Sequence, residues 1–184
     1  MRMLASKAQL RDSFLRWSLF TVPTCVLLGF LSGVFGGSPD SMWFQSLNKP
    51  ALFPDPRWFG IVWTILYILM GFTLALVCAA WGARGRIAAL VAFAVQFALN
   101  LAWTPVFFGL HQMSIALAVI LMLILAVVVT MVLFWRVRKL AAMLLLPYLA
   151  WICFAALLNY EFLAMNPDAD GVGDPTRAVQ RIAI

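Results

Sequence analysis

Charged residues and the single histidine divide the chain into five long uncharged stretches. They cover residues 17–39, 58–83, 87–110, 112–135 and 140–160, and contain 23, 26, 24, 24 and 21 residues. An α-helix rises 1.5 Å per residue, so about 20 apolar residues cross a hydrocarbon core of roughly 30 Å. Strands of a membrane barrel would instead be segments of about ten residues with alternating polarity, a pattern absent here. The chain is therefore expected to be an all-α integral membrane protein, a bundle of five transmembrane helices.

The stretches also predict boundaries. Residues 1–165 are expected to form one transmembrane domain, because no linker is long enough to separate two. The tail is rich in Asp, Gly and Pro and is expected to be disordered, while the first span is expected to be a retained helix rather than a signal peptide. The expected segments are spans at 14–35, 58–81, 87–108, 112–135 and 141–164, a loop at 36–57, a tight hairpin at 109–112 and a tail at 166–184.

Composition agrees with this class, since 65% of residues are hydrophobic and only 11% are charged. The net charge of +6 reflects an asymmetry across the membrane rather than a nucleic-acid-binding patch. With five spans, nine basic residues share the side of the N-terminus and four lie on the other side, so the positive-inside rule places the N-terminus in the cytoplasm and the C-terminus outside. The nine are Arg2, Lys7, Arg11, Arg16, Arg84, Arg86, Arg136, Arg138 and Lys139, and the four are Lys49, Arg57, Arg177 and Arg181.

The residues needed for most chemistry are missing from the spans. All seven acidic residues lie outside the span interiors, which disfavours proton-coupled transport. His111, the sole histidine, is expected to be a solvated turn residue, and no metal-ligating cluster is predicted. Cys25, Cys78 and Cys153 are expected to be small buried hydrophobic residues. Without a nucleophile elbow or a phosphate-binding loop, enzymes that use side-chain acid–base or nucleophilic chemistry are not indicated.

Neutral polar and aromatic residues instead recur at helical spacing inside three spans. Because polar side chains avoid lipid, these faces should point into the bundle. They could hold helices together by hydrogen bonds, or they could line a pocket in which a flat conjugated molecule stacks on indoles. The faces comprise Trp63 and Tyr67; Gln96, Asn100, Trp103 and Thr104; and Tyr148, Trp151, Ala155 and Asn159.

The remaining tryptophans and the first loop have simpler interpretations. Indoles at span ends are typical interface anchors. In the loop, Pro50, Pro54 and Pro56 favour a semi-rigid, extended chain, which could be a lid over the bundle mouth or a solvated connector. The expected anchors are Trp17, Trp43, Trp58, Trp81 and Trp135.

Three ordered motifs resemble the TspO/translocator-protein family, also called tryptophan-rich sensory proteins or peripheral benzodiazepine receptors. The likeness covers roughly residues 15–165. The motifs are Trp43…Leu47-Asn48-Lys49-Pro50…Arg57-Trp58…Trp63-Thr64…Tyr67, Gln96…Asn100…Trp103-Thr104-Pro105, and Pro147-Tyr148-Leu149-Ala150-Trp151…Ala155…Asn159-Tyr160.

The resemblance implies a five-helix bundle, often dimeric, that binds porphyrins such as protoporphyrin IX and haem. By motif position, the family pocket corresponds to Trp63, Tyr67, Asn100, Trp103 and Trp151, and its lid to Pro50, Pro54 and Arg57. The polar faces add Tyr148 and Asn159 to the candidate ligand-binding residues.

The resemblance further implies a membrane receptor or sensor linked to tetrapyrrole metabolism or stress responses, with no obligatory cofactor. Two alternatives are light-dependent porphyrin breakdown, in which Trp63 and Trp151 would take part, and transport of tetrapyrroles or sterols. A homodimer is expected through a ridge of small residues on the third span, formed by Ala94, Ala98 and Ala102.

Two departures from the family pattern affect these expectations. The family loop reads K-P-x-W-x-P-P, whereas residues 49–56 read KPALFPDP, so the tryptophan is missing and Asp55 looks inserted. The sterol motif needs Lys or Arg within five residues after its tyrosine, but residues 161–165 after Tyr160 read EFLAM. Sterol binding is therefore not indicated.

Overall fold

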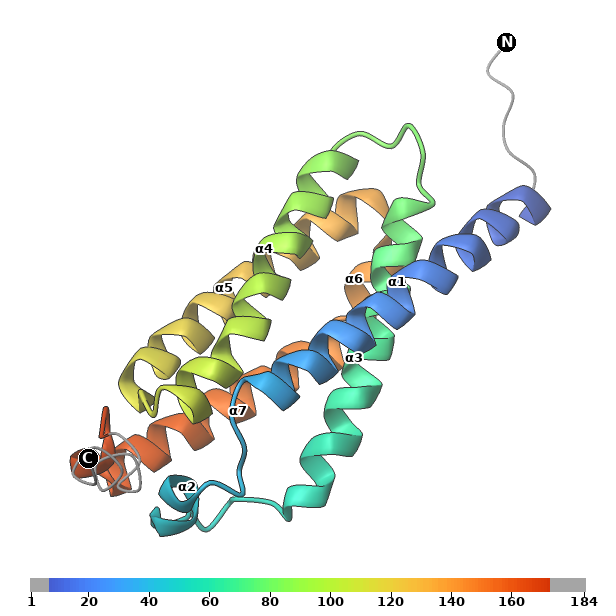
Figure 1. Ribbon diagram of the computed structural model, residues 1–184. Helices are drawn as coiled ribbons and strands as arrows, with labels where there is room; N and C mark the ends of the chain where they lie inside the picture. Colours follow the sequence, from blue (N-terminus) through green and yellow to red (C-terminus); the bar gives the residue numbers. More distant parts are fainter. Residues whose placement is uncertain (1–6, 173–184) are drawn as a thin grey trace, which may run out of the picture.

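The computed structural model describes residues 7–172, and five of its helical segments are long and apolar enough to cross a membrane (Figure 1). The expected all-α bundle of five spans is thus confirmed. The spans are α1 (Lys7–Phe35), α3 (Pro56–Cys78), α4 (Arg86–Thr104) with the π-helical turn η1 (Pro105–Gly109), α5 (Met113–Val137), and α6 (Lys139–Met143) followed by α7 (Leu146–Met165). Two short helices, α2 (Met42–Ser46) and the 3-10 turn η2 (Pro167–Ala169), lie outside the spans.

Small residues allow α1 and α3 to pack closely. The α-carbon of Gly71 lies against Val22, and a side chain at Gly29 would collide with the ring of Tyr67. The Thr21 hydroxyl donates a hydrogen bond of 2.8 Å to the Gly71 carbonyl across the same contact. Close backbone approach through small residues is a common way to join helices in lipid. Elsewhere α4 packs on α5, and α5 packs on α7.

The fifth span is broken rather than continuous over 141–164 as expected. The short helix α6 ends at Met143, and α7 begins at Leu146 with Pro147 in its first turn. A proline ring clashes with the carbonyl four residues earlier, here that of Met143, and has no amide hydrogen to donate. Pro147 is therefore accommodated at a new helix start, where both features are tolerated.

The second span begins at Pro56 and ends at Cys78, not at 58 and 81. Its first turn is capped by Asp55, whose carboxylate accepts a 3.0 Å hydrogen bond from the Arg57 amide. Proline directly after a capping aspartate is a typical helix start. The aspartate that looks inserted in the loop therefore has a structural role, and its position before Pro56 could have shown this.

The loop and tail also differ from expectation. The loop is not extended throughout, since α2 forms within it and is capped by the Ser41 side chain. The tail is not disordered from Asn166, because Pro167–Ala169 forms a turn and Asn166 is buried. The rest of the tail expectation, residues 173–184, lies outside the described residues. The chain's last described segment and α2 lie at the same end of the bundle, opposite the α3–α4 turn (Figure 1).

Candidate ligand-binding site

The predicted polar faces meet inside the bundle. Three hydrogen bonds join α3, α4 and α7: Tyr67 Oη to Asn100 Oδ1 at 3.0 Å, Tyr148 Oη to Gln96 Oε1 at 3.1 Å, and Trp103 Nε1 to Asn159 Oδ1 at 3.1 Å. We call these six residues, with Trp63, the aromatic–amide centre. Its polar members are buried apart from Trp103, which is half-buried.

Aromatic contacts complete the centre. The Trp63 and Tyr67 rings stack with centroids 5.5 Å apart and an interplanar angle of 28°. Trp63 also meets Tyr148 edge-on at 6.5 Å. These offset and edge contacts are the arrangements that aromatic quadrupoles favour. Residues from separate sequence motifs thus form one contact network.

The hydrogen bonds show that these residues do join helices, which was one of the two interpretations of the pattern. Asn159 adds a fourth link, because its Nδ2 donates to the Met113 carbonyl at 2.9 Å. Gln96 and Tyr148 have no exposed surface, so their own side chains fill the middle of the bundle. A ligand can enter the centre only if side chains move.

Not every polar atom at the centre is used, however. Among residues 7–172, three buried side-chain atoms have no hydrogen-bond partner: Gln96 Nε2, Trp151 Nε1 and Glu161 Oε2. Leaving a buried N–H unpaired costs roughly 1–3 kcal/mol, so native structures seldom do it without a reason. Two of the three are donors. Trp151 is a candidate ligand-binding residue, and Gln96 belongs to the aromatic–amide centre.

Trp151 lies at the edge of a hollow of about 400 Å³ between α3 and α7. The exposed rim residues Ile65 and Ala150 open this hollow towards the membrane. Phe59 meets Trp151 edge-on at 5.7 Å, and Phe154 lies 5.6 Å from it. The hollow is lined by Val62, Ile65, Leu66, Leu69, Pro147, Ala150, Trp151 and Phe154.

The predicted lid residues lie at one end of the bundle, apart from the centre. Pro50 is buried and Pro54 half-buried, but the Arg57 side chain is 89% exposed and its Nε lies 3.6 Å from Asp55. Lys49 extends over the Phe44 ring at 5.5 Å. The loop therefore presents two cations beside its apolar contacts.

Phe53 takes the main apolar position in this loop. Its ring lies 5.9 Å from Phe44, 5.4 Å from Phe59 and 5.4 Å from Phe162. Because Phe59 in turn touches Trp151, a chain of rings connects the loop to the α3–α7 hollow. The aromatic that the family pattern places in this loop is thus supplied by phenylalanine, one residue later in the sequence.

His111 and Trp43 correct two further expectations. His111 is buried, not solvated, and stacks on Trp43 with centroids 4.3 Å apart. Its Nδ1 lies 3.0 Å from the Val172 carbonyl, which can only accept, so Nδ1 carries the proton. Trp43 is likewise buried, and its Nε1 donates to the Ala169 carbonyl at 3.1 Å, so it is not an interface anchor. The φ of His111 is 59°, and histidine is one of the few non-glycine residues that tolerate a positive φ. This was the only indication in the sequence that His111 has a special structural position.

The predictions for the other tryptophans and the cysteines are confirmed in part. Trp58, Trp81 and Trp135 are exposed on the bundle surface, in agreement with an interfacial belt. Cys25 and Cys78 are buried as expected, whereas Cys153 is exposed. Cys153 follows the buried Ile152 on α7 and so falls on its outward face.

Comparison with known proteins agrees with this architecture. The TspO/MBR family profile matches residues 21–165. The tryptophan-rich protein TspO of Chlorobaculum tepidum is 40% identical over 78% of this chain and 91% of its own length. The tryptophan-rich sensory protein of Cereibacter sphaeroides is 43% identical over 70% and 78%, and the human translocator protein 42% over 64% and 71%. The chain therefore belongs to the TspO/MBR family and is an integral, multi-pass membrane protein.

Proposed function

We propose that this protein is a membrane receptor or sensor that binds flat conjugated tetrapyrroles, such as protoporphyrin IX or haem, at the aromatic–amide centre. The observation that carries the proposal is a pair of buried, unpartnered donors: Gln96 Nε2 in the aromatic–amide centre and Trp151 Nε1 at the α3–α7 hollow. A conjugated ligand with acceptor groups would satisfy these donors and stack on the indoles. The Cereibacter sphaeroides relative is named a tryptophan-rich sensory protein, which supports the receptor role.

The hollow between α3 and α7 is the proposed point of entry. α3 packs closely on α1 but shares few close approaches with α7. Between them, Trp151 lines the hollow together with Phe154, and its ring contacts both Phe154 and Phe59. A hydrophobic ligand dissolved in the bilayer could part this seam and reach Trp63 and Tyr148 without passing through water.

The cations of the loop suit the polar edge of such a ligand. Lys49 and Arg57 are exposed at one end of the bundle, and Arg57 lies in the first turn of α3. A porphyrin that stacks inside the bundle could direct its propionates towards these two side chains, where charge-assisted hydrogen bonds are strong. Neither cation needs to leave the aqueous interface for this contact.

The test is a titration of the purified protein with protoporphyrin IX, followed by tryptophan quenching. Trp151→Phe keeps an aromatic ring but removes the unpartnered donor, and a lost charge-neutral hydrogen bond of about 1 kcal/mol weakens binding roughly fivefold. Trp81→Phe, at an exposed interfacial indole, is the matched control and should leave affinity unchanged. Equal affinity of the wild type and a Trp103→Ala, Trp151→Ala double variant would overturn the proposed site.

A further inference from the structure

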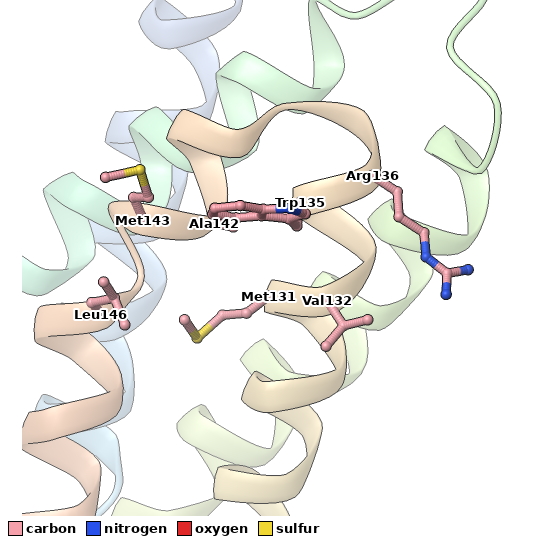
Figure 2. Close-up of a pocket in the computed structure, with 7 residues that line it drawn as sticks. All are labelled: Met131, Val132, Trp135, Arg136, Ala142, Met143 and Leu146. Carbon is pink, nitrogen blue, oxygen red and sulfur yellow. The ribbon is translucent and has the colours of Figure 1, made fainter.

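A second hollow lies where α6 meets the start of α7, on the side that faces α5, and its lining residue Leu146 directly precedes Pro147 of the α3–α7 hollow. It has a volume of about 320 Å³, near the lower limit of ligand pockets, and is almost wholly apolar. Met131 and Val132 of α5 form one side, and Met143 of α6 and Leu146 of α7 form the other (Figure 2). Val132, Met143 and Leu146 are about half exposed, so the hollow opens on the outer surface of the bundle.

The break in the fifth span creates this hollow. α6 ends at Met143 and α7 begins at Leu146, so the chain bends over the two residues between these helices. Trp135 lies at the end of the hollow nearest the α5–α6 turn, beside Ala142 (Figure 2). An indole at this position marks the level at which the hydrocarbon core meets the headgroup region.

Positive charge gathers directly beyond Trp135. The ammonium of Lys139 lies 5.5 Å from the Trp135 ring centroid, whereas the side chain of Arg136, which is also counted in the lining, extends from α5 away from Met143 and Leu146 (Figure 2). Arg138 stands between them in the turn. All three are exposed, and within residues 7–172 the only ion pair joins Asp55 and Arg57, so no described carboxylate neutralises this turn.

We infer that this hollow binds an anionic glycerophospholipid of the adjacent leaflet. One acyl chain would lie between α5 and α7 against Met131 and Leu146, and the headgroup phosphate would lie beyond Trp135 near Lys139, with Arg136 and Arg138 of the same turn adding to the local positive charge. Charge complementarity selects this occupant over a neutral lipid or a sterol, because the exposed cations of the α5–α6 turn, whose place on this side also follows from the positive-inside asymmetry, attract a headgroup with net negative charge. Each basic residue near a membrane surface favours anionic lipid by roughly fivefold in affinity.

The headgroup test uses the full chain in nanodiscs, in a Cys153→Ser background with a bimane label at Val128→Cys, one helical turn from Val132. Brominated-chain phosphatidylglycerol should quench this label at least fivefold more effectively than brominated phosphatidylcholine at equal mole fraction. The double variant Arg136→Gln, Lys139→Gln should abolish the preference. Arg84→Gln, an exposed cation in the α3–α4 turn on the same side, should not. Equal quenching by the two lipids, or a preference that survives the double variant, would overturn the inference.

The position test fills the hollow. Leu146→Trp should reduce quenching by brominated phosphatidylglycerol severalfold, because the added ring occupies the acyl-chain position. Leu121→Trp, at a comparably exposed position elsewhere on α5, is the control and should leave quenching unchanged. If both variants behave as the wild type does, the anionic lipid binds at the basic turn alone and the hollow is not its site.

Discussion

Tyr67 links α1, α3 and α4 through its ring and its hydroxyl. Gly29 leaves the space that the ring occupies, while the hydroxyl reaches Asn100. The ring also stacks on Trp63, so a shift of Tyr67 would also displace Trp63 within the aromatic–amide centre. The aromatic–amide centre therefore depends on the lack of a side chain at Gly29 as much as on the Tyr67 ring itself.

Gly29→Ala tests that dependence. A β-carbon at Gly29 would overlap the Tyr67 ring, so the ring must move, and such overpacking costs about 1–3 kcal/mol. Gly33→Ala, one turn later on α1, meets no atom within 4 Å and should be neutral or stabilising, because alanine favours helix. Thermal unfolding in detergent measures both. Equal melting temperatures for the two variants would contradict the described packing.

Asp55→Ala should destabilise the protein by about 1 kcal/mol, because it removes the cap of α3. Asp55→Asn should retain most of the stability, since its side-chain oxygen can still accept from the Arg57 amide. Denaturant titration compares the two substitutions. An equal loss for Asn and Ala would show that the ion pair with Arg57, which both substitutions remove, and not the cap, is what Asp55 contributes.

Single residues could be predicted from the sequence where lipid alone decides their position. Gln96, Asn100, Tyr148 and Asn159 had to face inward, because polar groups are costly in hydrocarbon, and they do. Their pairing could not be predicted, since it depends on how the helices are rotated and offset against each other. The burial of His111 was not predicted either, because it requires the start of the tail to return to the α4–α5 hairpin.

At the scale of elements, the loop and the start of the tail are held together by one asparagine. Asn166 Oδ1 accepts from the Asn48 amide at 2.8 Å, and Asn166 Nδ2 donates to the Asn48 carbonyl at 3.0 Å. The number and length of the spans followed from hydrophobicity alone. This contact joins residues 118 positions apart, so no local pattern could have indicated it.

Asn166→Ala should release the loop, because it removes both hydrogen bonds to Asn48. Asn48→Ala should not, since only the backbone of the exposed Asn48 takes part. Hydrogen–deuterium exchange of peptides from residues 36–57 should therefore rise in the first variant and stay at the wild-type level in the second. Similar exchange in both would show that Asn166 does not hold the loop.

For the whole molecule, we propose a homodimer through the third span and a cytoplasmic N-terminus. Ala94 and Ala98 are exposed on α4 and Ala102 is half-buried, so the first two are available to a partner helix. In a Cys153→Ser background, Ala98→Cys should form a disulfide-linked dimer in membranes. Ala118→Cys, an exposed alanine on α5, should give little product. Equal cross-linking at the two positions would argue against this interface.

The central claim is that the middle of the bundle receives a tetrapyrrole. The most direct measurement is the visible spectrum of the protein purified from cells supplied with 5-aminolaevulinate. The wild type and a Trp81→Ala, Trp135→Ala variant, changed only at exposed indoles, should carry a Soret band, and a Trp103→Ala, Trp151→Ala variant should lose it. A wild type without the band, or a band of equal strength in all three proteins, would contradict the claim.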